Sequence, residues 1–542
     1  MKEYLIQLFA KTAAKLPYLN DVNLILNVPN AVDHGDYATN IAMMLTKQLK
    51  KNPRQIAEEI ISNLDYDKNK IEKVEIAGPG FINFYFKTSF IPEIIKAVLA
   101  DGASFGRSEK YSGKKAMVEF VSANPTGPLT VGHGRNAVIG DTIANMLEWV
   151  GYKVDREYYF NNAGRQMRVL GDSVRLRYLE LLGESIQFPE DYYQGEYIKE
   201  IAQGLIDAHG DKLKNEGPEG IFKSTAEKEI FKDIAKTLAS IKIEFANYFN
   251  ENSLYTEGKI ESLLKTFKER NLSYEKEGAV WLKLTELGNE QDKVIVKSTG
   301  EPTYRLPDIA YHITKFERGY DLMVDLFGSD HNATYPDVLA GISALGYDKE
   351  KVKVLIHQFV TILDKGEVVK MSTRKANYIT LDELIEEVGS DVVRYFFNMR
   401  SIQSHLNFDI DVAKKQSDEN PVFYLQYAHA RICSILRMTE EQELHNSLEH
   451  LDLLTAPEEQ KLLKKLYEFK EEILYSTENF ETHRIANFLE ETAGLFHRFY
   501  TECRIIGSEK NLAEARISLV KAVQTVIKNG LTILGVNAPE RM

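Results

Sequence analysis

The spacing of apolar residues divides the 542-residue chain into stretches of different character. Before about residue 112, amphipathic helical segments such as 56–64 alternate with a strand-like run at 74–77, a Gly-Pro-Gly turn and an alternating run that begins at Phe81. A strand, a helix and a second strand then follow, in the order of a parallel sheet, at 115–121, 134–149 and 153–159. The pattern therefore predicts an α+β domain over residues 1–112, followed by an α/β domain.

The α/β pattern is interrupted once and then resumes. Residues 185 to about 250 are polar and rich in Tyr and Lys, which favours a helical insertion. Strand-like runs return at 294–296, 322–327, 352–356 and 358–363. From residue 420 onward, apolar residues recur at helical spacing. We therefore expect the α/β domain to cover 113–375, a connecting stem to cover 376–419 and an all-α bundle to cover 420–542.

Composition narrows the class of protein. The chain has 80 Asp and Glu against 67 Lys and Arg, and its net charge of −13 disfavours indiscriminate binding to DNA phosphates. Binding of one folded RNA through local contacts stays compatible with that charge. Such binding would require positive patches on a largely acidic surface. Cys433 and Cys503 are the only cysteines, too few for a disulfide framework or a four-cysteine zinc site. With no signal-like start and no apolar run long enough to cross a bilayer, we expect a cytoplasmic protein with neither a DNA nor a membrane partner.

The most informative segment joins the strand at 115–121 to the helix that begins at Gly134. Two prolines and three glycines end the strand and allow close backbone approach, while the N–H groups of the new helix favour an anion. His133, in the first turn, can donate to a phosphate oxygen. Residues 132–137 also fit a dinucleotide-binding fingerprint, with Asp155 as its acidic residue. The long proline-containing loop and the place of Asp155 at the start of its strand disfavour that alternative, whereas a plain helix start with a solvated histidine stays open.

A second segment, Lys370-Met-Ser-Thr-Arg-Lys375, follows a strand-like run and a turn. A basic loop of this kind can bring Lys370 and Arg374 to a triphosphate as charge moves onto a leaving pyrophosphate. Alone it is typical of a charged surface loop. Together with the first segment, in this order and on an α/β frame, it indicates a nucleotide site.

The two segments resemble the HIGH and KMSKS signatures of class I aminoacyl-tRNA synthetases, and the chain is similar from end to end to the arginyl-tRNA synthetase family. The resemblance rests on residues 34–40, 78–84, 123–133, 159–166, 304–311, 424–431 and 535–542. Thr130 stands where HIGH has its first histidine, and the second lysine of KMSKS is replaced within Ser372-Thr373-Arg374. Which cation follows the pyrophosphate, Lys370, Arg374 or Lys375, therefore stays open.

The resemblance implies a Rossmann-like catalytic domain of the HIGH/KMSKS type, an N-terminal additional domain that contacts tRNA and an all-α anticodon-binding bundle. It implies activation of L-arginine by ATP with Mg²⁺ and transfer to tRNA(Arg), in a monomer without structural zinc. Members of the family generally activate arginine only after tRNA is bound. The alternative is a non-catalytic tRNA-binding paralogue.

The resemblance also assigns residues. The implied catalytic residues are Thr130, His133 and Lys370. The implied ATP-binding residues are Gly132, His133, Gly134, Asp330, Lys370, Met371, Ser372 and Arg374. The HIGH region is Ala123, Asn124, Pro125, Thr126, Gly127, Pro128, Leu129, Thr130, Val131, Gly132 and His133. The implied arginine-binding residues are Ser122, Asn124, His133, Tyr304, Asp308 and His331, and those for tRNA are Phe81, Asn83 and Tyr427. No metal ligands are expected, and His429 and Cys433, four residues apart on one helix, are expected to be a packed interior pair.

Overall fold

The structure is a computed structural model, and it describes all residues except 21, 28, 30–33, 88–89, 330–333 and 370–378. Its N-terminal unit packs helices against a three-stranded antiparallel sheet of order β1-β3-β2. The elements are α1 (Lys2–Ala13), β1 (Tyr37–Thr39), α2 (Ile41–Met44), α3 (Thr46–Leu49), α4 (Pro53–Asn63), β2 (Ile71–Ala77) and β3 (Phe81–Phe86). The next helix, α5 (Ile94–Asp101), falls within the predicted N-terminal domain but packs against the C-terminal helices α18 (Pro457–Asn479) and α20 (Lys510–Leu534) instead. The predicted helix, strands and Gly-Pro-Gly turn of this region are confirmed.

A five-stranded parallel sheet of order β11-β10-β4-β5-β6 forms the centre of the molecule. Its strands are β4 (Lys115–Glu119), β5 (Lys153–Phe160), β6 (Asn247–Asn250), β10 (Leu322–Gly328) and β11 (Val352–His357). After its first residue, β4 is buried throughout, as expected for a parallel strand covered on both faces. The chain passes from β4 to β5 on one side and returns to β10 on the other, so the sheet has a topological switch point between β4 and β10.

Helices cover both faces of this sheet. On one face lies α6 (Val131–Trp149), which packs on β4 and β5. On the other, Met117 of β4 and Met323 of β10 share a core with α12 (Arg305–Glu317) and α13 (Tyr335–Ala344). The predicted strand–helix–strand order from 115 to 160 is confirmed.

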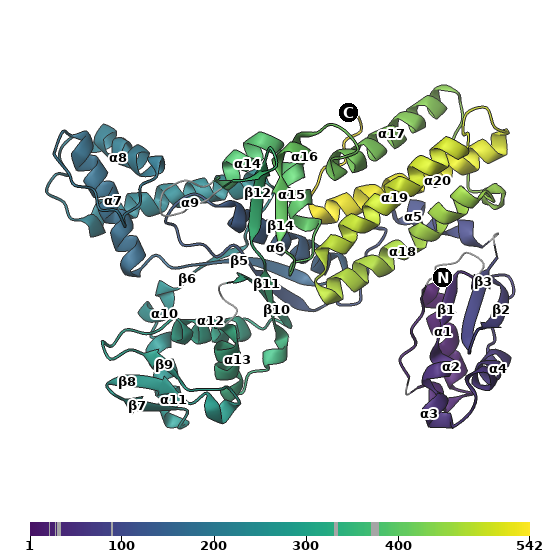
Figure 1. Cartoon of the computed structure of the whole chain (residues 1–542), viewed down its shortest axis with the longest axis horizontal. Coiled ribbons are helices and arrows are strands. Elements are labelled where there is room, and N and C mark those ends of the chain that lie inside the picture. The colour runs from purple at the N-terminus through teal and green to yellow at the C-terminus, as the bar shows by residue number, and fades with distance from the viewer. Residues whose placement is uncertain (21, 28, 30–33, 88–89, 330–333, 370–378) are drawn as a thin grey trace.

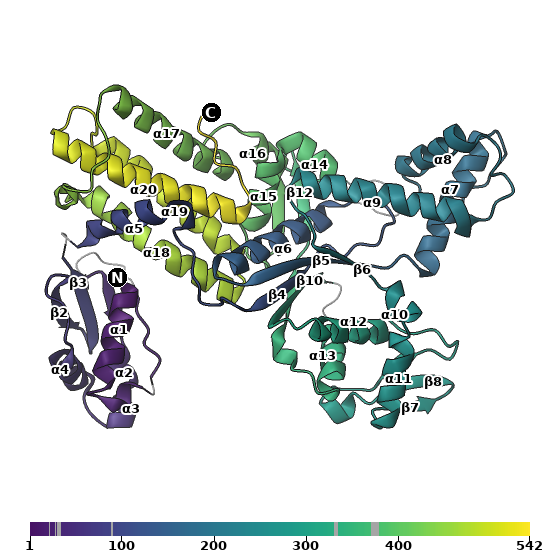
Figure 2. The same ribbon diagram turned by 180° about the vertical axis from the view of Figure 1, so that it is seen from behind.

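Two lobes leave the sheet between β5 and β10 (Figure 1). The helical lobe consists of α7 (Gly164–Leu181), α8 (Glu196–His209) and α9 (Lys223–Ser240). The mixed lobe contains α10 (Asn252–Thr256), α11 (Lys259–Glu269) and a small antiparallel sheet of β7 (Ser273–Lys276), β8 (Ala279–Leu282) and β9 (Lys293–Val296), together with α12 and α13. Figure 2 shows the two lobes well apart.

Two expectations for this region are corrected. The predicted insertion included residues 247–250, but these form β6 and pair with β5 in the central sheet. The predicted strand at 294–296 does form, but as β9 it pairs with β8 in the mixed lobe rather than extending the central sheet. Both errors have one cause, because the pattern of a short strand does not say with which strand it pairs.

A second small sheet links the α/β part to the stem. It pairs β12 (Val360–Asp364) with β13 (Glu367–Val368) and, in parallel, with β14 (Leu406–Asp409). The stem also contains α14 (Leu381–Val388), α15 (Ser390–Asn398) and α16 (Ile410–Lys414). The β12–β14 pairing crosses the boundary predicted after residue 375, so the stem and the α/β part share a sheet.

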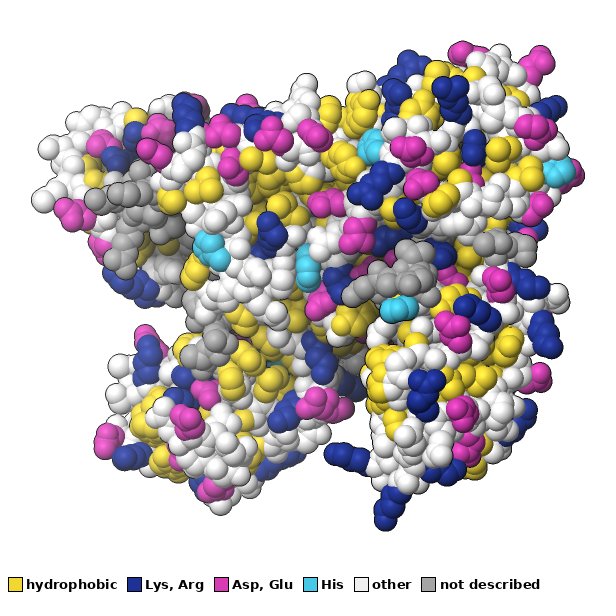
Figure 3. All heavy atoms as spheres, turned by 45° about the vertical axis from the view of Figure 1, so that its right-hand side comes forward, with side chains coloured by type: hydrophobic (Ala, Val, Ile, Leu, Met, Phe, Trp, Pro, Cys, Tyr) yellow, Lys and Arg dark blue, Asp and Glu magenta, His cyan; other side chains and the backbone are white. Residues whose placement is uncertain are grey.

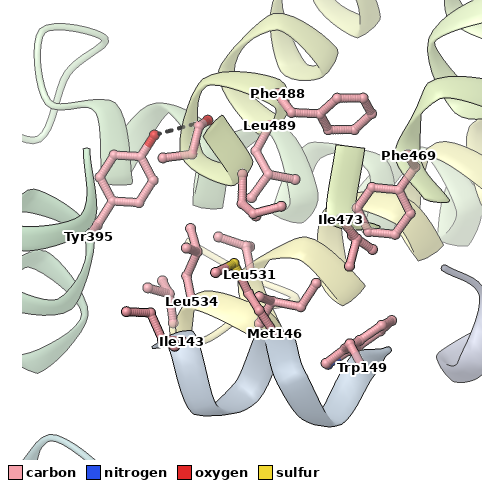
Figure 4. Packing of buried hydrophobic residues seen from close by; sticks show 14 of the residues in the cluster. Ile143, Met146, Trp149, Tyr395, Phe469, Ile473, Phe488, Leu489, Leu531 and Leu534 are labelled. Atoms are coloured by element: carbon pink, nitrogen blue, oxygen red, sulfur yellow. Dashed lines mark hydrogen bonds between the residues drawn. The ribbon is translucent and has the colours of Figure 1, made fainter. Parts of the chain in front are cut away.

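The C-terminal bundle consists of α17 (Pro421–Glu441), α18 (Pro457–Asn479), α19 (Thr482–Glu502) and α20 (Lys510–Leu534). Figure 4 shows side chains of α18, α19 and α20 converging on Ile143, Met146 and Trp149 of α6, so the bundle and α6 share one core. At its edge, Tyr395 donates a hydrogen bond of 2.6 Å to Glu490. The N-terminal unit contacts this bundle through an ion pair between Lys464 and Asp36.

Helix α20 corrects one expectation. Within the described part of the chain it is the one helix long and apolar enough, by length and composition, to cross a membrane. Its apolar window is 72% buried in the protein, where it packs against α17, α18 and α19. Burial inside the bundle therefore accounts for the apolar composition of α20.

A buried arginine joins three parts of the fold. The guanidinium of Arg394, on α15, donates to the backbone oxygens of Leu534 at 2.9 Å and Ile241 at 2.7 Å, and it pairs with Asp141 on α6. Arg394 thus connects the C-terminal end of α20, the C-terminal end of α9 and the middle of α6. Gly535, at φ 69°, lies so close that a Cβ there would be 2.2 Å from the guanidinium carbon.

Replacing Gly535 with alanine is expected to destabilise the protein by about 3 kcal/mol, because the change combines a strained left-handed backbone with displacement of Arg394. Gly507→Ala is the matched control: its φ is 87° and a Cβ added there would have no neighbouring atom within 4 Å, so only the strain of about 1 kcal/mol remains. Thermal unfolding midpoints measure both. Equal losses in the two variants would contradict the proposed contact with Arg394.

Candidate active site

The candidate site lies at the switch point of the central sheet, where β4 and β10 end. Open α/β sheets bind ligands outside the carboxyl ends of their strands at this point. The loop from Phe120 to Leu129 leaves β4 here and leads into α6.

The backbone is strained where β4 ends. Val121 has φ 66° and Ser122 has φ 44°, a left-handed conformation that is exceptional for a β-branched residue. Asn136 on α6 stabilises it: its side-chain oxygen accepts from the Val121 N–H at 2.6 Å, and its amide donates to the Leu326 carbonyl of β10 at 2.9 Å. One side chain therefore fixes both strand ends relative to α6.

The first turn of α6 is built for donating hydrogen bonds. Thr130 is the N-cap, and its hydroxyl accepts from the His133 N–H at 3.4 Å. In return, Nδ1 of His133 accepts from the Thr130 N–H at 3.2 Å. Because the ring accepts at Nδ1, its neutral form carries the proton on Nε2. The backbone N–H of Thr130, rather than its side chain, thus sets the tautomer of His133.

The loop before this turn is held by side chains from several elements. Tyr158 donates to the Ala123 carbonyl at 2.8 Å, and Tyr197 of the helical lobe donates to the Thr126 carbonyl at 2.7 Å. The side-chain oxygen of Asn124 accepts from the Asn161 N–H at 2.9 Å. The HIGH region therefore connects the sheet to the helical lobe.

Arg135 secures the other side of the same turn. It is fully buried, and its guanidinium donates to the carbonyls of Gln358 at 2.8 Å, Ser404 at 2.9 Å and Ser401 at 3.1 Å. Burial lowers its pKa to about 10. The start of α6 is thus bonded to the segments that enter β12 and β14.

Asp308 lies in the first turn of α12. Its side chain is one-third exposed, and its N–H donates to the carbonyl of Tyr304, the half-exposed residue one turn earlier. The expected placement of Tyr304 and Asp308 one helical turn apart is confirmed. Behind Asp308, His312 and Lys315 of the same helix are buried and contact Asp325 of β10.

Two further carboxylates make this region acidic. Glu251 accepts from the Tyr159 hydroxyl at 2.7 Å, and burial raises the pKa of Glu251, with the charge of Asp308 adding to the effect. Burial likewise raises the pKa of Glu119, against the ammonium of Lys315 at 2.6 Å. Burial, then the charges of Glu251, Asp308 and Glu119, raise the pKa of Tyr159. Glu251 and Asp308 thus place acidic charge near Tyr159, whereas the charge of Glu119 is paired with Lys315.

The sequence reasoning missed Glu119, Glu251 and Tyr159. Glu119 had a usable signal, because it is a charged residue within an otherwise apolar buried strand. Glu251 and Tyr159 had none, since they meet only through the pairing of β5 with β6.

The predicted site residues do not all come together. Ser122, Asn124, Thr130 and His133 lie at the end of β4 and the start of α6, while Phe81 and Asn83 lie on β3 and Tyr427 on α17. Asp330, His331, Lys370, Met371, Ser372, Arg374 and Lys375 lie outside the described residues. His429 and Cys433 are a buried pair, with Nδ1 and Sγ 3.8 Å apart, which confirms the predicted interior pair. Within the ranges that the structure covers, no three His, Cys, Asp or Glu residues are grouped to hold a metal ion.

A parallel sheet, a strained strand end that leads into a T-V-G-H helix start, and a K-M-S-T segment later in the chain define the catalytic domain of a class I tRNA synthetase. A family model for the class I (R) tRNA synthetase catalytic domain matches residues 94–396. Models for the arginyl tRNA synthetase N-terminal domain and the DALR anticodon binding domain match residues 3–86 and 425–542. The chain belongs to the arginyl-tRNA synthetase family.

Curated relatives agree with this placement. An arginine–tRNA ligase of Salinibacter ruber is 50% identical over 96% of both chains, and one of Pelodictyon phaeoclathratiforme is 48% identical over 100% of both. The arginyl-tRNA synthetase structure of Thermus thermophilus matches the fold with a TM-score of 0.79 over 100% of both chains, at 21% identity. The predicted fold class and enzyme class are confirmed, and the non-catalytic paralogue is not favoured.

Proposed function

We propose that the enzyme activates L-arginine with ATP to arginyl-adenylate, then transfers the arginyl group to the 3′-terminal adenosine of tRNA(Arg), with release of pyrophosphate and AMP. One observation supports this most directly: the donor-rich start of α6 and the carboxylate-lined region at Asp308 flank the same switch point. The first suits phosphates, and the second suits a guanidinium.

The activation step needs positioning and charge stabilisation more than a base. The arginine carboxylate is already ionised, so it can attack the α-phosphate directly. His133, through Nε2–H, and the backbone of Gly132 and Gly134 would donate to phosphate oxygens. Lys370, with Met371, Ser372 and Arg374, would follow the leaving pyrophosphate.

Arginine would be selected at Asp308. A carboxylate accepts two parallel N–H bonds from a planar guanidinium, which an ammonium cannot match. Tyr304 would pack against the ligand, while Ser122 and Asn124 would bind its amino or carboxylate end. Asp330 would contact ATP, and His331 would contact arginine.

Recognition of tRNA would use both ends of the chain. Phe81, 38% exposed on β3, and Tyr427, 42% exposed on α17, offer ring faces on which unstacked bases can stack. Asn83 is buried and has a side-chain oxygen without a partner, so its contact with RNA would need a local rearrangement. On the face drawn in Figure 3, Lys and Arg side chains, interspersed with Asp and Glu, line both sides of the gap between the N-terminal unit and the mixed lobe. These cations would be available to RNA phosphates.

Mg²⁺ would enter with ATP. Mg²⁺ commonly binds through substrate phosphates with few protein ligands. We also propose a cytoplasmic monomer with no DNA or membrane partner. Sedimentation at the mass of one 61.8-kDa chain would support the monomer, and twice that mass would refute it.

The deciding experiment is transfer of labelled arginine to bulk tRNA with MgATP. We expect acid-precipitable label that depends on ATP and on tRNA, and none with labelled lysine. The tRNA must be present from the start, because family resemblance implies that activation requires it. No charging at micromolar enzyme would refute the proposed function.

A further inference from the structure

Both ring nitrogens of His312 face oxygen acceptors. Nδ1 lies 2.9 Å from the backbone oxygen of Asp308 and 3.1 Å from its carboxylate, and Nε2 lies 2.9 Å from the carboxylate of Asp325. A carbonyl or carboxylate oxygen only accepts, so each nitrogen must carry a proton. The geometry therefore describes an imidazolium, buried to all but 3% of its surface.

The contacts behind His312 form a continuous network. Asp325 pairs with Lys315 at 2.7 Å, and Lys315 pairs with Glu119 at 2.6 Å. Glu119 in turn accepts from the Ser122 hydroxyl at 3.0 Å. Charge-assisted hydrogen bonds thus run from Asp308, at the mouth of the proposed guanidinium site, to the strained end of β4.

The charges that face His312 keep it cationic. Burial and the neighbouring Lys315 oppose its charge, but hydrogen bonds with Asp308 and Asp325 outweigh them and raise the pKa of His312 to about 9. A neutral ring would present one nitrogen lone pair to a carboxylate, which is repulsive. At neutral pH, His312 therefore donates to the Asp325 carboxylate and to the Asp308 backbone oxygen, and it forms an ion pair with the Asp308 carboxylate, which lies 3.1 Å from Nδ1.

We infer that His312 is a positioning residue for arginine recognition: it fixes the plane of the Asp308 carboxylate so that two oxygens accept parallel N–H bonds from the guanidinium. A bidentate pair depends on this plane, because a rotated carboxylate offers one oxygen only. The inference rests on the proposed role of Asp308. It adds that specificity for arginine depends on a buried hydrogen-bond donor that touches no substrate.

Two neutral replacements distinguish the contact that Nδ1 of His312 makes from the contact that Nε2 makes. In His312→Asn the amide nitrogen takes the place of Nδ1 and can still donate to Asp308, whereas in His312→Gln it takes the place of Nε2 and reaches only Asp325. In full-length enzyme with tRNA and ATP, we expect His312→Gln to raise the KM for arginine by about 10-fold or more, the effect of one hydrogen bond to a charged group. His312→Asn should stay within about threefold of the parent. For both variants, kcat and the KM for ATP should change less than about twofold.

Repeating the His312→Gln change in an Asp308→Asn enzyme tests whether His312 affects the KM for arginine through Asp308. If His312 acts through Asp308, His312→Gln should cause little further rise in the KM for arginine once Asp308 is Asn. Independent, multiplying effects would overturn the inference, as would equal rises in the KM for arginine and ATP, or an unchanged KM in His312→Gln. If Asp308→Asn itself leaves the KM for arginine unchanged, the proposed role of Asp308 fails, and the inference fails with it.

Asp325→Asn covers the case in which His312→Gln does not fold. It removes the charge behind the imidazolium and leaves His312 in place. The KM for arginine should rise with that for ATP unchanged. An unchanged KM for arginine would overturn the inference, and thermal unfolding of each variant verifies that it is folded.

Discussion

Replacing Asp308 with alanine is expected to raise the KM for arginine by about 100-fold, while the KM values for ATP and tRNA change less than about threefold. The change removes a carboxylate that would accept two charge-assisted hydrogen bonds from the guanidinium. It also leaves the imidazolium of His312 with one carboxylate instead of two. Steady-state arginylation with each substrate varied in turn measures the effect.

Glu317→Ala is the matched control for Asp308→Ala. Glu317 lies at the far end of the same helix, where it pairs with Lys259 at 3.1 Å on the surface. Its loss should leave all three KM values unchanged. Equal increases in the KM for arginine and ATP in Asp308→Ala would remove Asp308 from guanidinium recognition.

Local pattern predicted much of the fold. The strands at 115–121 and 153–159 and the helix between them were predicted from the local spacing of apolar residues, and the structure contains β4, α6 and β5 there. The errors concern pairing: β6 was assigned to the insertion, and β9 to the central sheet. Strand pairing depends on contacts between distant residues, which the local pattern does not contain.

The candidate site was predictable where it depends on consecutive residues. The start of α6 is such a place, because the cap at Thr130 and the histidine at 133 lie within one turn. The network of Glu119, Lys315 and Asp325 was not, because its members are separated by up to 206 residues (325 − 119) and meet only in the folded sheet. His312 therefore had no sequence signal as a residue that contacts two carboxylates.

The structure shows where some of the excess acidic residues lie. The excess of acidic residues includes Glu119, Glu251 and Asp308, whose charges raise the pKa of Tyr159. Acidic charge at this place would favour the proposed binding of arginine. Contacts with RNA are proposed at Phe81 and Tyr427, in the other two parts of the fold.

His133→Ala is expected to lower kcat for arginylation by about 100-fold to 1,000-fold, the effect of removing one preorganised donor to charge that develops in the transition state. The Thr130 N–H bonds to Nδ1 and so directs the donor, Nε2–H, away from the helix cap. The KM for ATP should change little, because the donor acts mainly on charge that is absent from the bound ground state.

His133→Gln is the matched replacement, since its amide nitrogen takes approximately the place of Nε2 and can still donate. We expect it to recover at least about 10-fold of the activity lost in His133→Ala. Rates should be measured with tRNA at saturation, so that slow tRNA binding does not mask the chemical step. A large rise in the KM for ATP with an unchanged kcat would assign His133 to ground-state binding. Equal activities of the Ala and Gln variants would show that the Nε2 donor has no part in the reaction.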